Sequence, residues 1–271
     1  MKILLTTINA RYAHCSYSLR TLKANMGVLA PDTGMIEFTL TEKVDQMCEA
    51  LMRHNPTIVG MSVYIWNRGR IQELVAYLKI AAPHVIIVLG GPEVSYAPLD
   101  DSLVSLADHI IAGEGEESFP RLCTDLLHNR TREKHITSDL PDISGLALPY
   151  DLYSEHDITT RTIYVESSRG CPFRCNFCLS ALDTKVRRFD KDAILDALTR
   201  LHARGVRHFK FLDRDFTFGH PIANLEQFLE LGTENLLLHF ELHPGTITPE
   251  IEALLRRFPT GSIQLEIGFQ T

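Results

Sequence analysis

Three of the six cysteines in the chain lie within eight residues, as Cys171, Cys175 and Cys178 of the segment CPFRCNFC. Thiolates are soft ligands that suit zinc, copper and iron–sulfur clusters. A structural zinc site usually has four protein ligands, and this segment supplies three, because Cys123 and His156 lie elsewhere in the sequence. An iron–sulfur cube held by three thiolates keeps one iron without a protein ligand, where a substrate or cofactor can bind. The spacing therefore favours a catalytic iron–sulfur cluster, with a zinc or ferredoxin-like site as the alternative.

The spacing of these cysteines resembles the motif of the radical S-adenosylmethionine (SAM) superfamily. That motif is Cys-x3-Cys-x2-Cys in the loop after the first strand of a barrel, with an aromatic residue before the third cysteine, and Phe177 occupies that place here. The resemblance implies that Cys171, Cys175 and Cys178 hold a [4Fe–4S] cluster whose open iron binds SAM. It also implies that an electron from the reduced cluster cleaves SAM to methionine and a 5′-deoxyadenosyl radical, and that Phe177 lies against the adenine.

Polar residues follow three later candidate strands, at the strand ends where barrel-type enzymes place functional groups. They are Asp213 and Asp215 in FKFLDRDF, Glu241 and His243 in HFELHPG, and Glu266 and Gln270 in QLEIGFQT. In the radical SAM superfamily such groups contact the ribose, amino group or carboxylate of SAM, and Glu241 and Gln270 most resemble those contacts. Asp213 and Asp215 are candidates for the same role, although an aspartate at this place also commonly caps the turn that follows a strand.

Short apolar runs alternate with amphipathic segments over residues 1–128, which predicts an α/β domain with a parallel sheet covered by helices. We expect strands over residues 2–7, 35–40, 58–63, 85–90 and 109–112. We expect helices over residues 16–26, 42–53, 70–80 and 116–128, where apolar residues recur at helical spacing. This arrangement is a five-stranded, doubly wound, flavodoxin-like domain. Such domains bind ligands beyond the carboxyl ends of their strands, near the point where the strand order reverses.

The rest of the chain begins with residues 129–160, which are polar and irregular and are predicted to be a linker. A second series follows, with strands over residues 162–166, 208–212, 237–242 and 263–269 and helices over residues 191–203, 224–231 and 249–257. The resemblance implies that residues 161–271 form an incomplete radical SAM (β/α) barrel. Because the sequence stops after an apolar strand that no helix covers, we expect a protein truncated within the barrel. A complete small domain closed by dimerisation is the alternative.

The strand ends of the first domain carry small residues in a pattern that resembles cobalamin-binding domains. Those domains use a serine after a mid-sheet strand and two glycines after the next strand. Here Ser62 ends VGMS, and Gly90 and Gly91 follow VIIVL. Glycine lets the backbone approach a large planar ligand with no Cβ in between. The loop with Gly113 and Glu114 completes the same edge, and the resemblance implies that cobalamin binds along it.

The loop after the first strand departs from the cobalamin-binding pattern. Domains that bind cobalt through histidine carry Asp-x-His-x-x-Gly there, whereas this sequence has His14 with Tyr12 and Tyr17 at the Asp and Gly positions. A ligating histidine usually needs a hydrogen-bond acceptor that fixes its tautomer, and the expected carboxylate is missing. We therefore expect His14 to line the cobalamin pocket or to pack against it rather than to bind cobalt.

Composition and charge exclude several classes of protein. Hydrophobic residues make up 45% of the chain and charged residues 23%, as in ordinary globular proteins. The net charge of −7 argues against a broad electrostatic surface for nucleic acid. No run approaches the about 18 apolar residues of a membrane span, and the N-terminus lacks a signal peptide's apolar region and cleavage site. We therefore expect a cytoplasmic protein without membrane or nucleic-acid partners, in which Cys15, Cys48 and Cys123 are small buried apolar residues.

The two resemblances together imply a cobalamin-dependent radical SAM enzyme. It would abstract hydrogen from an unactivated carbon of a small-molecule or otherwise unknown substrate, and then methylate or rearrange that carbon. An electron donor such as flavodoxin or ferredoxin would reduce the cluster. Two alternatives stay open, which are a radical SAM enzyme without cobalamin chemistry and a non-catalytic fragment that binds a cofactor or partner. The substrate cannot be read from the sequence, because specificity resides in surface loops and in segments outside this chain.

Overall fold

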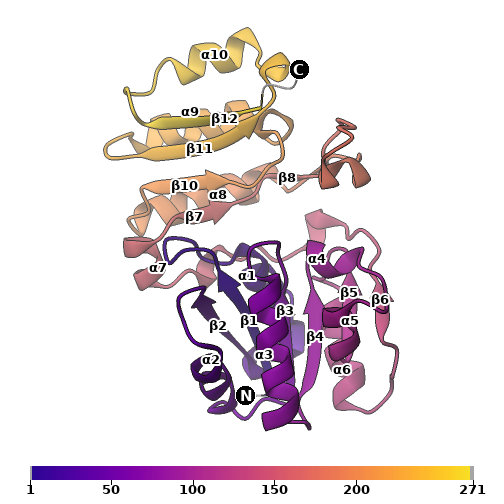
Figure 1. Ribbon diagram of the computed structural model, residues 1–271. Coiled ribbons are helices and arrows are strands. Elements are labelled where there is room, and N and C mark those ends of the chain that lie inside the picture. The colour runs from indigo at the N-terminus through magenta and orange to yellow at the C-terminus, as the bar shows by residue number, and fades with distance from the viewer. Residues whose placement is uncertain (1, 269–271) are drawn as a thin grey trace. The chain divides into compact units, whose positions relative to one another are not determined.

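The computed structural model describes residues 2–268, which divide into two compact units (Figure 1). Unit 1 runs to Asp142 and includes Leu146–Leu152, and unit 2 comprises Ile143–Gly145 and the chain from Tyr153 onward. Each unit is built on a parallel sheet of its own. No helix in the described range is both long enough and apolar enough to cross a membrane.

Unit 1 contains a parallel sheet whose strands lie in the order β2-β1-β3-β4-β5-β6. The strands are β1 (Ile3–Asn9), β2 (Thr33–Thr39), β3 (Ile58–Ser62), β4 (Ile86–Gly90), β5 (His109–Ala112) and β6 (His135–Thr137). The order reverses at β1, because β2 pairs on one side of it and β3 on the other. The carboxyl edge between β1 and β3 is therefore the topological switch point, where such sheets bind ligands.

The sixth strand corrects the prediction of a five-stranded sheet and of a linker over residues 129–160. β6 has three residues and pairs with β5, and the same segment also contains the 3-10 helix η3 (Tyr150–Leu152) and helix α7 (Glu155–Thr160). A three-residue strand in a polar stretch gives no periodicity to detect. The segment expected to separate two domains is instead divided between the two units.

Helices cover both faces of the unit 1 sheet. They are α1 (Tyr17–Ala24), α2 (Val44–Met52), α3 (Arg68–Ala81), α4 (Pro92–Ser95), α5 (Ser102–Leu106), α6 (Ser118–Leu127) and the 3-10 helix η1 (Gly27–Asp32). Adjacent residues of β1 enter different cores, because Leu4 packs in a cluster with Leu51 of α2 and Ile3 in a second cluster with Phe119 of α6. A strand buried on both sides has no solvent face, which explains why β1 shows no alternation of polar and apolar residues.

Unit 2 contains a four-stranded parallel sheet in the order β12-β11-β10-β7. Its strands are β7 (Ile163–Val165), β10 (His208–Phe211), β11 (Leu237–Leu242) and β12 (Ile263–Ile267), and its longer helices are α8 (Lys191–Ala203), α9 (Pro221–Leu231) and α10 (Pro249–Leu255). The strands are added in one direction along the chain, so right-handed crossovers place these three helices on one face. A radical SAM barrel stays a prediction, since the structure describes a four-stranded parallel sheet here.

The two faces of the unit 2 sheet differ in chemistry because side chains alternate along each strand. Phe209 and Phe211 are fully buried on the helix side, where the ring of Phe209 lies 4.9 Å from that of Phe228 in α9. The residue between them, Lys210, projects to the other face, beside its register partner His239. One face therefore forms a phenylalanine-rich core and the other carries ionisable groups.

Candidate functional site

The three loop cysteines lie on an excursion that leaves the unit 2 sheet after β7 and returns before α8. Its regular elements are β8 (Ser168–Arg169), the 3-10 helix η4 (Leu179–Leu182) and β9 (Arg187–Arg188), and β8 and β9 pair in antiparallel fashion. The Cys171 N–H donates to the carbonyl of Asp183 at 2.9 Å. A Cβ on Gly170 would lie 2.3 Å from the carbonyl oxygen of Lys185, and its φ is +89°, so only glycine fits where the two arms meet. We call residues 170–186 the cysteine loop.

The thiols of Cys171 and Cys175 are half-buried and that of Cys178 is exposed. Burial raises the pKa of Cys171, the Phe173 N–H partly offsets this, and the negative charges of Cys178, Cys175 and Asp215 raise it further. The thiols therefore lie near enough to repel one another as thiolates. Within residues 2–268, however, no three His, Cys, Asp or Glu side chains converge closely enough to hold a metal ion. Thiolates are soft ligands that suit iron–sulfur clusters, and the positive charge of iron would offset the repulsion between them. The chemistry of these three side chains therefore fits an iron–sulfur cluster.

The two aromatic residues of the cysteine loop have different surroundings. The Phe173 ring lies 4.7 Å from the His243 ring and 5.9 Å from that of Phe218, so it packs against the loops that follow β11 and β10. Phe177 is 73% exposed. Its ring is accessible for the contact with adenine that the sequence predicts, and that contact stays a prediction.

Asp213 lies directly after β10 and is fully buried. Its carboxylate accepts hydrogen bonds from the Ser167 N–H at 3.0 Å and from the hydroxyls of Ser167 and Ser168, each at 2.6 Å. Burial raises the pKa of Asp213, and these hydrogen bonds oppose that shift. The sequence analysis made Asp213 a candidate contact for SAM. The structure instead places it beneath the start of the cysteine loop, with both oxygens engaged by protein donors.

Asp215 joins two strand-end loops of unit 2. Its Oδ1 accepts from the N–H and hydroxyl of Thr217, at 2.9 and 2.6 Å, and so caps the 3-10 helix η5 (Phe216–Phe218). Its Oδ2 accepts from the His243 N–H at 3.2 Å and from the Thr246 hydroxyl at 2.9 Å, in the 3-10 helix η6 (Pro244–Thr246) after β11. Capping of a turn, which the sequence left open for this aspartate, is therefore what the structure shows.

Glu241 belongs to the ionisable face of the unit 2 sheet. Lys210 Nζ lies 3.8 Å from Glu241 Oε1 and 3.1 Å from Glu266 Oε2, and His239 Nε2 lies 2.9 Å from Glu266 Oε2. The hydrogen bond from Lys210 is the main cause that lowers the pKa of Glu266 below its ordinary value. Sequence reasoning missed Lys210, which only the strand register brings beside the two glutamates. Gln270 lies outside the described residues.

Ser62 ends β3 at the switch point of unit 1 and is buried. The Tyr64 hydroxyl donates to Ser18 Oγ at 2.9 Å, and Ser18 Oγ donates to Ser62 Oγ at 3.3 Å. The rings of Tyr64 and Trp66 stack with centroids 4.5 Å apart, and Trp66 Nε1 donates to the Ile8 carbonyl at 3.2 Å. We call Tyr64 and Trp66 the aromatic shelf. Because Trp66 is 47% exposed, the shelf offers a flat apolar surface that fits a large planar ligand.

The glycines predicted to approach cobalamin lie at the ends of the next two strands. Gly90 ends β4, and a Cβ there would meet only the Ile111 carbonyl oxygen, at an ordinary 3.6 Å. Gly91 has φ +103°, and its Cβ would lie 2.5 Å from the Val63 carbonyl oxygen, so the fold itself requires this glycine. Gly113 follows β5 directly, and Glu114 is the next residue. The structure thus brings the predicted residues after β3, β4 and β5 to one edge of the sheet.

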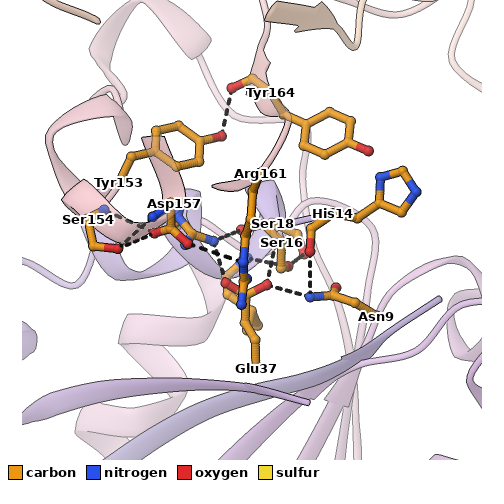
Figure 2. Close-up of polar contacts among 12 residues, drawn as sticks. Asn9, His14, Ser16, Ser18, Glu37, Tyr153, Ser154, Asp157, Arg161 and Tyr164 are labelled. Carbon is orange, nitrogen blue, oxygen red and sulfur yellow. Dashed lines mark hydrogen bonds and ion pairs between the residues drawn. The ribbon is translucent and has the colours of Figure 1, made fainter. Parts of the chain in front are cut away.

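A buried carboxylate that sequence reasoning missed holds the loop with His14. Glu37 of β2 accepts hydrogen bonds from Asn9 Nδ2 and from the Ser16 N–H, each at 2.6 Å (Figure 2). Arg20 Nη1 lies 2.6 Å from Glu37 Oε1, and the two side chains are only 2% and 7% exposed. Asn9 Nδ2 also donates to the His14 carbonyl at 3.0 Å. The feature of the sequence that could have indicated this buried charge is the single glutamate in the mostly apolar strand segment MIEFTL.

The cysteines outside the cysteine loop are buried, as the sequence predicts. Cys15, Cys48 and Cys123 all lie in unit 1. Burial raises the pKa of Cys123 to about 12, so its side chain stays a protonated thiol. The two groups of cysteines are therefore chemically distinct, with partly or fully exposed potential ligands in one and apolar core residues in the other.

Residues 6–123 match the B12 binding domain family. The chain carries a B12-binding domain. This domain spans β1 to α6 and contains the aromatic shelf, the His14 loop, Ser62, Gly90, Gly91 and Gly113. The family match therefore covers Ser62 at the switch point and the glycines that follow the next two strands of the sheet.

About two thirds of the chain resembles proteins that are named as methyltransferases. It is 24% identical over 219 residues to the cobalamin-dependent radical SAM methyltransferase TokK of Streptomyces tokunonensis, which covers 68% of this chain and 32% of TokK. It is 26% identical over 199 residues to the methyltransferase PH0819 of Pyrococcus horikoshii, covering 63% of this chain and 42% of that protein. The chain thus spans less than half the length of these curated relatives and is homologous to cobalamin-dependent radical SAM methyltransferases.

The solved structures of the radical SAM methyltransferase TsrM from Kitasatospora setae have a similar fold. The structure with cobalamin and a [4Fe–4S] cluster bound matches with a TM-score of 0.72 and 16% identity, over 99% of this chain and 59% of TsrM. The structure with tryptophan and a SAM analogue bound matches with a TM-score of 0.71 and 16% identity, over 98% of this chain and 58% of TsrM. At this identity the likeness shows the α/β fold with its parallel sheets.

Proposed function

We propose that this chain belongs to a cobalamin-dependent radical SAM enzyme, in which Cys171, Cys175 and Cys178 hold a [4Fe–4S] cluster that binds SAM at its open iron. The observation that carries the proposal is the cysteine loop. It presents three thiols in Cys-x3-Cys-x2-Cys spacing after a strand of a parallel sheet, and it does so in a chain that also carries a B12-binding domain. The similarity to TokK and the fold of TsrM support the same proposal.

The residues of the chain supply binding and orientation for this chemistry. When bound, the cluster supplies the electron for reductive cleavage of SAM, and cobalamin supplies the methyl carrier. The exposed ring of Phe177 offers a stacking surface for adenine. Glu241 accepts hydrogen bonds from the polar groups of SAM. In unit 1, the aromatic shelf and the backbone at Gly90 and Gly113 contact the corrin, and His14 lines the pocket without binding cobalt.

The reaction that we propose is methylation, or alternatively rearrangement, of an unactivated carbon in a small molecule. Two relatives are named for small-molecule substrates, which are a 2-(S-pantetheinyl)-carbapenam-3-carboxylate in Streptantibioticus cattleyicolor and a cytidylyl-2-hydroxyethylphosphonate in Streptomyces wedmorensis. The cluster also needs a reductant, for which we propose a flavodoxin or ferredoxin. The small-molecule substrate and the protein reductant are both inferred from the proposed chemistry.

Anaerobic reconstitution of the full chain with iron, sulfide and hydroxocobalamin tests the proposal. We expect Mössbauer spectra of one four-iron cluster, absorbance of one corrinoid, and 5′-deoxyadenosine from SAM under reduction. Cys175→Ala should lose both the cluster and SAM cleavage, whereas Cys48→Ala, a change to a buried cysteine of unit 1, should keep both. A Cys175→Ala protein that still forms 5′-deoxyadenosine would refute the cluster assignment.

The same preparation separates the cobalamin part of the proposal from the rest. Trp66→Ala removes half of the aromatic shelf and should weaken corrinoid retention while leaving the cluster spectra unchanged. Tyr77→Ala, a change to a half-exposed aromatic residue of α3, is the control and should retain the corrinoid. A wild-type chain that forms the cluster but takes up no corrinoid would favour radical SAM chemistry without cobalamin.

A further inference from the structure

Two aspartates that lie two residues apart act beside the cysteine loop. Asp213 binds the residues that lead into the loop, and Asp215 binds the chain after β11, against which Phe173 packs. We propose that Asp213 and Asp215 are positioning residues, which hold the cysteine loop in its shape before any cluster binds. Asp213 fixes the base of the loop and Asp215 fixes the surfaces on which its first half packs. This inference rests on the proposed function of the loop and adds residues that neither bind iron nor contact SAM.

The base of the loop is fixed at Ser167. Its N–H and hydroxyl both donate to the buried Asp213 carboxylate, and the Ser168 hydroxyl is a third donor. The Ser167 carbonyl in turn accepts from the N–H of Phe189, at 3.1 Å, on the arm that returns from the loop. One carboxylate therefore holds the residue to which both arms are attached. Without it, three buried donors would lose their acceptor, which strongly opposes this arrangement.

The chain after η5 packs closely against the hydrogen bond between Asp213 and Ser167. A Cβ on Gly219 would lie 2.1 Å from Ser167 Oγ and 2.8 Å from Asp213 Oδ1. The backbone after η5 therefore packs directly against the hydrogen-bonded pair. The Gly219 backbone therefore helps to fix the position of the Ser167 hydroxyl and of the carboxylate that it binds.

The first half of the loop is fixed through Phe173, which lies between Cys171 and Cys175 in sequence. Its ring packs against the rings of His243 and Phe218. Asp215 positions the residues that carry both of these rings. It accepts a hydrogen bond from the His243 N–H, and it caps η5, which ends at Phe218. The carboxylate thus holds the loops after β10 and β11 at the separation that receives Phe173.

The proposal is tested on the full chain without cofactors, where no bound cluster can order the loop. Limited trypsin digestion cuts after Arg174, inside the loop, and mass spectrometry gives the rate of that cut. We expect Asp213→Ala and Asp215→Ala to raise this rate about tenfold, because the local open population rises when buried hydrogen bonds are lost. Asp192→Ala, a change to an 85% exposed aspartate of α8, should leave the rate at the wild-type value.

Milder variants keep the test decisive if an alanine variant does not fold, as judged by circular dichroism. Ser168→Ala removes one donor to Asp213, and Thr246→Val removes one donor to Asp215 with little change of volume. Each should raise the cleavage rate after Arg174 severalfold. In reconstituted protein, the electron paramagnetic resonance spectrum of the reduced cluster should broaden in the same variants. Folded variants that are cleaved at the wild-type rate and give the wild-type spectrum would overturn the proposal.

The two proposals fail in different ways. A wild-type chain that takes up no cluster would defeat the proposed function, but the digestion comparison would still decide whether the aspartates order the loop. Conversely, wild-type cluster uptake together with unchanged digestion of the aspartate variants would defeat only the positioning role.

Discussion

The two parallel sheets of this chain distribute their polar groups in opposite ways. In unit 1 both faces of the sheet pack against apolar cores, since the neighbouring residues Ile3 and Leu4 enter separate clusters, and the candidate ligand contacts lie in loops at one edge. In unit 2 one face carries Lys210 and His239, each within hydrogen-bonding distance of Glu266. A sheet that helices cover on both sides leaves only its strand ends for chemistry. A sheet covered on one side can also use its strand interiors.

Strand order explains this difference. In unit 1 the order reverses at β1, so the connections run in both directions and helices pack on both faces. In unit 2 each strand is added beside the previous one, so the crossover helices stay on one side. The same βα repeat therefore gives a two-sided core in one unit and a one-sided core in the other.

The largest effect that we predict contrasts the two faces of β10. Phe211→Ala should lower the free energy of unfolding of unit 2 by about 3–5 kcal/mol, because the fully buried ring packs against those of Phe216 and Phe240. Lys210→Ala, one residue earlier, should lower it by less than about 1 kcal/mol. Urea denaturation followed by circular dichroism measures both. Equal losses would show that the two faces are not as different as the structure describes.

The next effect concerns the buried ion pair of unit 1. Glu37→Gln should cost about 3 kcal/mol of unfolding free energy, because it leaves the Arg20 charge buried beside a neutral amide. The control is Glu252→Gln, which removes an exposed partner of Arg256 and should cost no more than about 0.5 kcal/mol. Urea midpoints that shift alike in the two variants would contradict the assignment of Glu37 as a buried structural charge.

A smaller effect tests the edge of the B12-binding domain. Gly91→Ala should lower the free energy of unfolding by about 1–3 kcal/mol, because the new Cβ meets the Val63 backbone at a positive φ. Gly69→Ala in α3 should be neutral or stabilising, since nothing lies within 4 Å of its Cβ and alanine favours a helix. Thermal unfolding distinguishes the two. A tolerated Gly91→Ala would mean that this glycine serves the ligand and not the fold.

The smallest effect is a pH dependence on the ionisable face of unit 2. The pKa of Glu266 is lowered, mainly by its hydrogen bond from Lys210, so its contribution to stability is present above the pKa of the unfolded chain. That contribution is lost as the pH falls through the lower pKa of the folded state. Lys210→Met should move the pKa of Glu266 up toward its ordinary value. Carbon-detected NMR titration of the glutamate carboxyls checks this, and an unchanged pKa would contradict the pairing.

Much of the fold follows from local periodicity in the sequence. The helix predicted over residues 191–203 is α8 (Lys191–Ala203), and the strand predicted over residues 237–242 is β11 (Leu237–Leu242). Helix α9 begins at Pro221, earlier than the predicted residue 224, because proline is readily accommodated in the first turn of a helix. The short strand β6 was missed because its place in the sheet is decided by pairing with β5, which no local pattern records.

The candidate site was predictable only where its residues are close in sequence. The three loop cysteines are predicted as ligands from their spacing, and Ser62, Gly90 and Gly91 are predicted as ligand contacts from their places after strands. The role of Asp213 was not predictable, because its donors lie 45 and 46 residues away and its burial depends on them. The contact of Arg20 with Glu37 likewise joins a helix and a strand 17 residues apart.

The cysteine loop leaves and rejoins unit 2 at one place, where β8 pairs with β9 and Gly170 meets Lys185. A segment whose ends meet can change its length or its residues while the strands beneath it keep their register. We therefore expect that a loop of different length, grafted between Ser168 and Arg188, leaves the unit 2 sheet intact. The cysteine loop and the sheet that carries it are therefore separable parts of unit 2, so the sequence of one can change while the other is kept.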